Sequence, residues 1–206
     1  PSNLLERAYN NLSRDAALTR LSKELRERIS SQGLSYAEPI LQQVPEIVSQ
    51  ILAIRTVQVW TFYRQSTPVE HWEADRVHSR PLPWLDEEGF RTQLCRELNE
   101  RNPLQEPASW RGRVLQKQDE KRGSSVAFCD VLDARPEHIW VFVIHTPPGS
   151  PAPNAWWLDY FERIALELRY ALSTVEDQRR LILQEKSKAN ISLSRNLGHD
   201  LTNIIA

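Results

Sequence analysis

The sequence SSVAFCDVLDARPEHIWVFVIHT, residues 124–146, is the most informative guide to the fold of the middle of this chain. Two of its segments, 124–132 and 138–146, are rich in β-branched and aromatic residues, and a polar segment that contains a proline separates them. Runs of this kind, bounded by polar and proline-containing segments, are typical of β-strands. We therefore predict two strands here, the first richer in small residues and the second almost entirely apolar.

Shorter elements precede this pair of strands. The segments 36–53 and 86–98 are predicted as helices, and 56–63, 69–74 and 109–116 are predicted as strands. We expect an early proline break in the first helix, whereas the acidic residues at the start of the second suit the positive end of the helix dipole. Because the elements show no regular βαβ alternation, the sequence predicts an antiparallel α+β domain.

The two flanks of this domain are predicted as long helices, because every proline except Pro1 lies between Pro39 and Pro153. Asn154 can cap the second of these helices. In that helix one row of residues alternates steps of four and three: Phe161, Ala165, Leu168, Leu172 and Val175, continued by Arg179, Ile182, Lys186, Ala189 and Leu193. This spacing predicts a coiled-coil seam, through which two copies of the chain would dimerise.

Composition excludes several classes of function. The chain has 26 basic and 27 acidic residues, so no basic surface for nucleic acid is expected. No run of about 18 apolar residues is present that could span a membrane. Cys95 and Cys129 form no CxxC pattern, which fits a reducing cytoplasm and argues against a disulfide scaffold or a zinc cluster. Since the chain starts on Pro1 and contains no methionine, we expect a fragment of a longer cytoplasmic protein.

Alternation along the strands separates small apolar residues from aromatic ones. One set comprises Val57, Val59, Ile139, Val141 and Val143, and the other comprises Trp60, Phe62, Trp140 and Phe142. We expect the aromatic set to share one face of the sheet. It either walls a small-ligand cavity, with Trp110 and Cys129 as neighbours, or fills the core, which is the commoner use of aromatic residues.

No metal site is predicted among the histidines of the domain. His138 and His145 are seven residues apart, and an odd separation on a strand places two side chains on opposite faces, so they cannot chelate one metal. A haem held through His145 or His71 stays open as an alternative, although nothing in the spacing supports it.

The stretch NLGHDLTNIIA closes the chain and interrupts the seam. Leu197 and Leu201 follow Leu193 in two successive four-residue steps, a stutter that locally unwinds a coiled coil. On a helix His199 lies about 200° from Leu197, so we predict that His199 faces solvent, with Asn203 one turn further on the same face. Neutral imidazole is a competent nucleophile near pH 7, which suits phosphoryl transfer.

The string HDLTN resembles the H-box of sensor histidine kinases. By that resemblance His199 is the phosphoacceptor, Asp200 assists phosphotransfer, and Asn203 serves phosphatase activity toward a response regulator. Thr202 belongs to the same motif. The proline found after many H-boxes is replaced here by Ile204, so the string looks like a subgroup of the motif.

The predicted order of elements over 36–175 resembles a GAF domain, with a PAS domain as the nearest competitor. SSVAFCDVLDARPEHIWVFVIHT looks like the closing strand pair of that family, and WWLDYFERIALELRYAL is similar to its exit helix. The usual glycine of the last strand is absent from IWVFVIH, which implies a differently shaped pocket. The resemblance implies a domain that binds a small ligand or only dimerises.

These resemblances predict the sensory and dimerisation region of a two-component sensor histidine kinase. Its parts are a signalling helix (1–35), a GAF-like domain (36–154), an exit helix with coiled coil (155–195) and the start of the phosphotransfer helix (196–206). They imply a homodimer, a response regulator receiver domain as partner, and ATP with Mg²⁺ for the parent kinase. We expect the fragment to lack the ATP-binding domain of that kinase and therefore to be inactive alone. The alternative is a stand-alone GAF or PAS module that binds a small ligand, or senses redox state or haem, and dimerises without histidine phosphorylation.

Overall fold

In the computed structural model the described residues are 2–31, 37–66, 70–119, 123–151 and 153–205. Within these ranges, side chains are described over 12–116 and 125–194. The elements follow one another as α1 (Ser2–Ser31), α2 (Glu38–Leu52), β1 (Val57–Gln65), β2 (His71–Ser79), α3 (Glu87–Glu100), a 3₁₀ helix η1 (Pro107–Trp110), β3 (Arg113–Asp119), β4 (Gly123–Ala134), β5 (His138–His145) and α4 (Ala155–Ile205).

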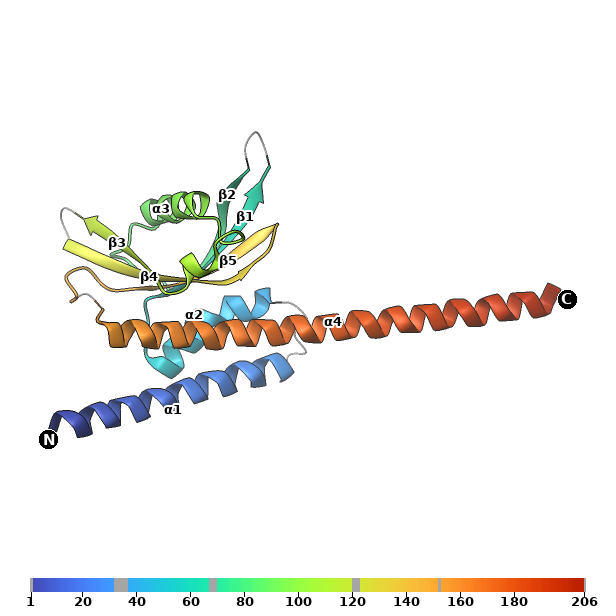
Figure 1. Cartoon of the computed structure of the whole chain (residues 1–206), viewed down its shortest axis with the longest axis horizontal. Helices are drawn as coiled ribbons and strands as arrows, with labels where there is room; N and C mark the ends of the chain where they lie inside the picture. The colour runs from blue at the N-terminus through green and yellow to red at the C-terminus, as the bar shows by residue number, and fades with distance from the viewer. Residues whose placement is uncertain (1, 32–36, 67–69, 120–122, 152, 206) are drawn as a thin grey trace.

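The strands form one antiparallel five-stranded sheet in the order β2-β1-β5-β4-β3. The closing strand pair is therefore confirmed, and its second strand, β5, lies at the centre of the sheet beside β1 (Figure 1). The strand predicted over 109–116 begins only at Arg113, because the preceding residues form η1. The predicted α+β class is thus confirmed.

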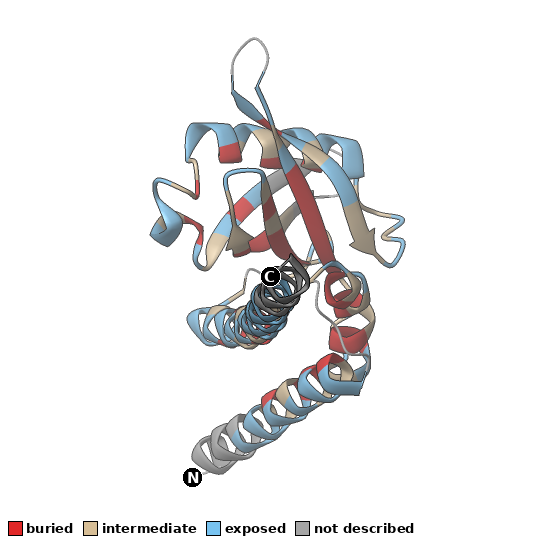
Figure 2. Ribbon diagram, turned by 90° about the vertical axis from the view of Figure 1, so that its right-hand side faces the viewer, coloured by how far each residue is buried: buried red, intermediate tan, exposed pale blue. Residues whose placement is uncertain are grey.

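Helices cover both faces of the sheet. The helix α3 and the short η1 lie over one face, whereas α2 and α4 lie over the other, and α1 packs on α2 and α4 outside them (Figure 1). Figure 2 shows buried residues concentrated in the strands and on the helix sides that face them. The core accordingly has two parts, one between the sheet and α2–α4–α1 and one between the sheet and α3.

The helices α1 and α4 run side by side in the same direction (Figure 1). The guanidinium carbon of Arg14 lies 3.0 Å from the centroid of the Trp156 ring and 4.1 Å from that of Trp157, and Asp15 forms an ion pair with Arg163 at 2.7 Å. Such cation–π contacts favour the pairing of the two helices. No helix in the described part of the chain combines the length and the apolar character that a membrane crossing requires.

The structure confirms the predicted cap of α4 but not the predicted proline break in α2. The Asn154 side chain accepts a hydrogen bond from the Trp157 backbone N–H at 3.0 Å, so the predicted cap of α4 is confirmed. The expected proline break in α2 is wrong, because α2 continues from Glu38 to Leu52 with Pro39 in its first turn and Pro45 inside it. A proline in the first turn removes no helical hydrogen bond, and packing of the apolar face of α2 on the sheet holds the helix together across Pro45.

The coiled-coil prediction needs correction for the first half of α4. Phe161, Ala165, Leu168, Leu172 and Val175 are buried inside the domain, where they pack on the sheet and the other helices of the same chain. An amphipathic helix on a sheet and a coiled-coil helix share the same spacing of three and four residues, so the pattern does not separate the two. From Asp177 to Ser194, every side chain except that of Arg179 is exposed.

Candidate functional site

The structure divides the six residues of the predicted pocket between the two faces of the sheet. Trp60, Phe62, Trp110 and Cys129 lie on the α3 face, whereas Phe142 and Trp140 lie on the α2–α4 face. The expectation of one aromatic face is therefore wrong. Strand β1 pairs with β5 so that Trp60 faces Val141 and Val59 faces Phe142, and paired residues of neighbouring strands share a face.

The four residues on the α3 face are packed tightly. Trp60, Phe62 and Trp110 have no exposed surface. The ring of Trp60 lies 6.3 Å from that of Phe62 and 6.1 Å from that of Phe90, which comes from α3. These distances are typical of aromatic pairs in a core, so the geometry favours core packing over a ligand wall for these side chains.

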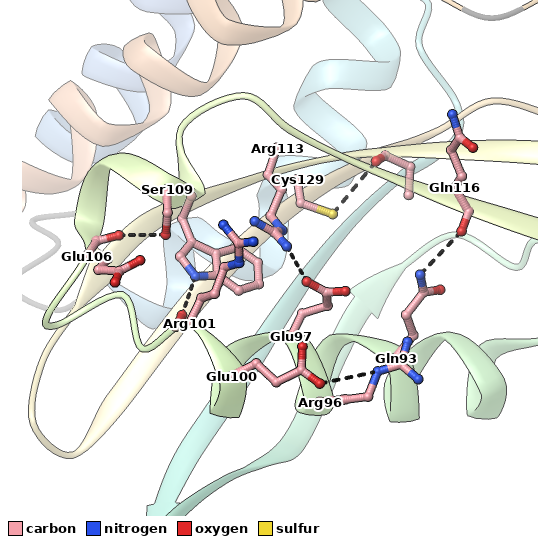
Figure 3. Close-up of polar contacts among 12 residues, drawn as sticks. Gln93, Arg96, Glu97, Glu100, Arg101, Glu106, Ser109, Arg113, Gln116 and Cys129 are labelled. Atoms are coloured by element: carbon pink, nitrogen blue, oxygen red, sulfur yellow. Dashed lines mark hydrogen bonds and ion pairs between the residues drawn. The ribbon is translucent and has the colours of Figure 1, made fainter.

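Polar contacts fasten α3 to the strand β3 (Figure 3). Glu97 of α3 forms an ion pair with Arg113 at the start of β3, and the Gln93 amide donates a hydrogen bond to the Gln116 carbonyl at 3.3 Å. The Trp110 indole N–H donates to the Arg101 carbonyl at 2.6 Å. These contacts connect both η1 and β3, which follow the loop, to α3 and its C-terminal end.

Beneath α3, the side chains of Gln58, Trp60 and His145 form a buried hydrogen-bond network. The Gln58 Oε1 atom is 3.0 Å from Trp60 Nε1 and 2.8 Å from His145 Nε2. Because an indole N–H can only donate, the oxygen of the amide must face it, and His145 Nε2 must then donate as well. Gln58 Nε2 is buried and has no hydrogen-bond partner among the described residues.

Cys129 is a poor candidate for redox chemistry. Its side chain has no exposed surface, and its thiol lies 4.0 Å from the Ala127 carbonyl. Burial raises the pKa of the Cys129 thiol far above its usual range. Since the thiolate is the reactive form, the environment keeps this cysteine unreactive.

A buried carboxylate joins α4 to strand β4 of the sheet. Asp130 of β4 is 1% exposed, forms an ion pair with Arg169 of α4, and accepts a hydrogen bond from the Gly112 backbone N–H at 3.2 Å. Burial raises the pKa of Asp130 to about 6, an effect that the charge of Arg169 opposes. The pair fixes the first third of α4 against β4.

A second ion-pair network lies where α4 leaves the domain. Arg135, in the turn between β4 and β5, donates to Asp133 at 2.8 Å and to Glu176 of α4 at 3.1 Å. Arg179 and Arg180 also approach the Glu176 carboxylate, each at 3.9 Å. Beyond this point the α4 side chains are almost all exposed, so Glu176 belongs to the last firm connection between the sheet and the exit helix.

Two grooves flank this connection, and we call them the junction grooves. They have volumes of about 540 and 550 Å³. Both are lined by Ala37, Arg135, Trp140 and Glu176. Sequence reasoning grouped Trp140 with the aromatic residues of the other face. It did not identify Arg135 or Glu176, because no local pattern marks a contact between residues 41 positions apart.

The predicted H-box lies on the backbone of α4, which continues as a helix through Ile205. The side chains of His199, Asp200, Thr202 and Asn203 lie outside the described side chains, so the predicted exposure of His199 stays a prediction. For the domain histidines, His145 packs against Phe90 on the α3 side, whereas His138 stacks on Trp140 on the other side, which confirms their opposite orientation. Within the described ranges, no group of three or more His, Cys, Asp or Glu side chains could hold a metal ion.

No family model and no curated protein matches the sequence. Among solved structures, the chain is similar to the N-acylhomoserine lactone dependent LuxR family transcription factor CepR2 from Burkholderia cenocepacia, with a TM-score of 0.44 and 11% identity, covering 80% of this chain and 97% of that one. It is also similar to GAF3 of Slr1393 from Synechocystis sp. PCC6803 in its photoproduct state (TM-score 0.41, 12% identity, 72% and 99% covered). A third similar structure is the second GAF domain of DevS from Mycobacterium smegmatis (TM-score 0.38, 14% identity, 71% and 99% covered). With TM-scores below 0.5, these similarities assign neither a family nor a function to the chain.

Proposed function

We propose that this chain is the sensory and dimerisation region of a two-component sensor histidine kinase, in which a GAF-like domain is coupled through α4 to the phosphoacceptor His199. The observation that carries the proposal is the continuity of α4. One helix packs in the core of the domain as far as Val175 and continues through the HDLTN string. At 1.5 Å per residue, His199 then lies about 36 Å beyond Val175 along the same rigid element.

The proposed chemistry of the H-box follows from its residue types. The His199 imidazole would attack the γ-phosphorus of ATP, the bond to the β,γ-bridging oxygen would break, and ADP would leave. The Asp200 carboxylate would accept a hydrogen bond from the other ring nitrogen and stabilise the positive charge that develops. The phosphoryl group then passes to an aspartate of a response regulator, and Asn203 would orient a water molecule when the regulator is dephosphorylated. Another domain of the parent kinase would bind ATP and Mg²⁺ and present the γ-phosphoryl group to His199.

The proposed homodimer is supported by the exposed part of α4. The helix α1 ends at Ser31, and α4 has little cover beyond Glu176. Ile182 and Leu193, which are 41% and 59% exposed, continue the row that is buried further back in the domain. A second copy of α4 would cover this row, because a long single helix with exposed leucine and isoleucine side chains gains most of its stability from packing.

Phosphorylation of the parent kinase tests the proposal directly. With radiolabelled ATP, the parent protein should acquire acid-labile phosphate, and His199→Gln should abolish it. The matched control is His71→Gln, because His71 is an exposed histidine of β2 outside the helix, and this variant should keep its phosphate. Label retained at the original level in His199→Gln would overturn the proposal.

A further inference from the structure

We propose that the junction grooves form a binding site for a small planar aromatic molecule that carries an anionic group, either a carboxylate or a phosphate. Their volumes of about 540 and 550 Å³ fall within the range of small-molecule sites. The site lies on the α2–α4 face of the sheet, opposite the tightly packed α3 face. The existence of the site does not depend on the proposed kinase function.

Trp140 provides the surface on which an aromatic ligand stacks. Its half-buried side chain lines both grooves and lies 4.6 Å from the ring of His138, measured between centroids. Tyr63 and Pro39 add further apolar surface to the second groove. A planar ring that enters beside Trp140 would gain offset stacking and bury apolar area at the same time.

Arginine side chains supply the charge that an anion requires. Glu176 faces Arg135, Arg179 and Arg180 within 3.9 Å, so three guanidinium groups surround one carboxylate. Asp133, and Asp177 on the wall of the first groove, offset part of this charge. The Glu176 carboxylate marks the position that a ligand carboxylate or phosphate would occupy, because guanidinium groups bind both through the same paired N–H donors.

An unpaired polar atom in the second groove also points to a ligand. His138 Nε2 is buried and has no hydrogen-bond partner within the described part of the chain. Burial, and then the nearby charge of Arg135, lowers the pKa of His138, so the ring is neutral at pH 7. Since an unpaired buried nitrogen costs stability, a ligand that hydrogen-bonds to it gains affinity.

Binding would act on the exit helix through the Arg135–Glu176 ion pair. An anion that reaches Arg135 competes with Glu176 for the same N–H donors and weakens the last firm connection between the β4–β5 turn and α4. This regulatory consequence rests on the proposed function, whereas the binding itself does not.

Nuclear magnetic resonance of the ¹⁵N-labelled 206-residue chain tests the site. Its seven tryptophans each give an indole N–H signal, and Trp140→Leu identifies that of Trp140 by removing it. The probes are indole-3-acetate and adenosine monophosphate, with indole and adenosine as their neutral counterparts. We expect at least one anionic probe to shift the Trp140 signal saturably, with a Kd at least tenfold lower than that of its neutral counterpart.

Arg135→Met should weaken binding of that probe at least tenfold. The matched control is Arg64→Met, because Arg64 pairs with Glu70 away from the grooves, and its affinity should be unchanged. Unaltered signals of the other tryptophans show that each variant is folded. The proposal is overturned if neither anion shifts the Trp140 signal, if the neutral probes bind equally well, or if Arg135→Met binds normally. Because no phosphoryl transfer is measured, this outcome is independent of the His199 test.

Discussion

Asp130 shows how a single buried group connects two elements that are distant in sequence. Its carboxylate accepts a hydrogen bond from the Gly112 backbone N–H and pairs with Arg169, so the turn before β3 and the first third of α4 meet at one residue of β4. Gly112 has a positive φ of 63°, which suits glycine, and a side chain there would meet Glu162 of α4. This close approach allows the backbone N–H to reach Asp130.

The pKa of Asp130 predicts a pH dependence of stability. The folded-state pKa is about 6, against 3.8 in the unfolded chain, so the folded state binds the proton more tightly. The contribution of Asp130 is therefore fully present below pH 3.8 and is lost as the pH rises through about 6. A pKa difference of about 2 corresponds to at most about 3 kcal/mol.

Urea unfolding of the wild type and of Asp130→Asn at pH 4 and pH 7 measures this contribution. We expect the unfolding free energy of the wild type to fall more steeply, or to rise less, between these pH values than that of Asp130→Asn. Parallel pH profiles for the two proteins would contradict the assignment, because all other titrating groups are common to both.

At the scale of the elements, polar contacts at the C-terminal half of α3 help to hold this helix on the sheet. Its apolar side is short and consists of Phe90, Leu94 and Leu98. The Glu97–Arg113 ion pair lies beside them, with only 15% and 18% of the two side chains exposed. A partly buried pair of this kind is costly to break, because the remaining charge is left without a partner.

Replacement of Glu97 by alanine should therefore lower the unfolding free energy by about 2 kcal/mol. The matched control on the same helix is Glu100→Ala, which removes an exposed pair with Arg96 at 4.0 Å and should cost less than about 0.5 kcal/mol. Urea titrations followed by far-UV circular dichroism give both values. Equal losses in the two variants would show that burial of the Glu97 pair is unimportant.

The exposed half of α4 should dimerise through one face. Ile182 lies on the proposed seam, whereas Leu181 is one residue, or about 100°, away from it. Ile182→Glu should weaken the dimer at least tenfold in light-scattering or sedimentation measurements, and Leu181→Glu should leave it nearly unchanged. If both variants dimerise like the wild type, the interface lies elsewhere.

At the scale of the whole molecule, α4 is the element that reaches from the α+β domain to the HDLTN string. The proposed signal is a change in packing or rotation of paired α4 helices, which alters the exposure of His199. Such a signal depends on the rotational phase between the domain and the histidine. Four residues change the phase of a 3.5-residue repeat by about 50°, whereas seven residues preserve it.

Insertions near 186–190 of the parent kinase test this mechanism. A four-residue insertion should change autophosphorylation several-fold, and a seven-residue insertion at the same place should have little effect. The seven-residue insertion adds more helix, about 10.5 Å against about 6 Å, but it preserves the phase, so a larger effect of the four-residue insertion would come from rotation and not from length. Equal activity in both would argue against a rotational mechanism.

Local patterns in the sequence were sufficient for the α+β class, for the closing strand pair and for the Asn154 cap. Hydrophobic period and capping chemistry depend on neighbouring residues only, so they can be read without the fold. The position of Trp140 could not be read in this way. Its alternation with Ile139 was correct, but the pairing of β1 with β5 decides which residues of the two strands share a face.

What the sequence determined by itself was the set of elements and the presence of an HDLTN string at the end of a long helix. The surfaces that those elements leave free depend on how the elements pack together. Residues 161–175 follow a coiled-coil spacing but are buried by the chain's own sheet, and Arg135 meets Glu176 although 41 residues separate them. Periodicity specifies that one side of a helix is apolar, whereas the partner that covers this side depends on contacts between distant parts of the chain.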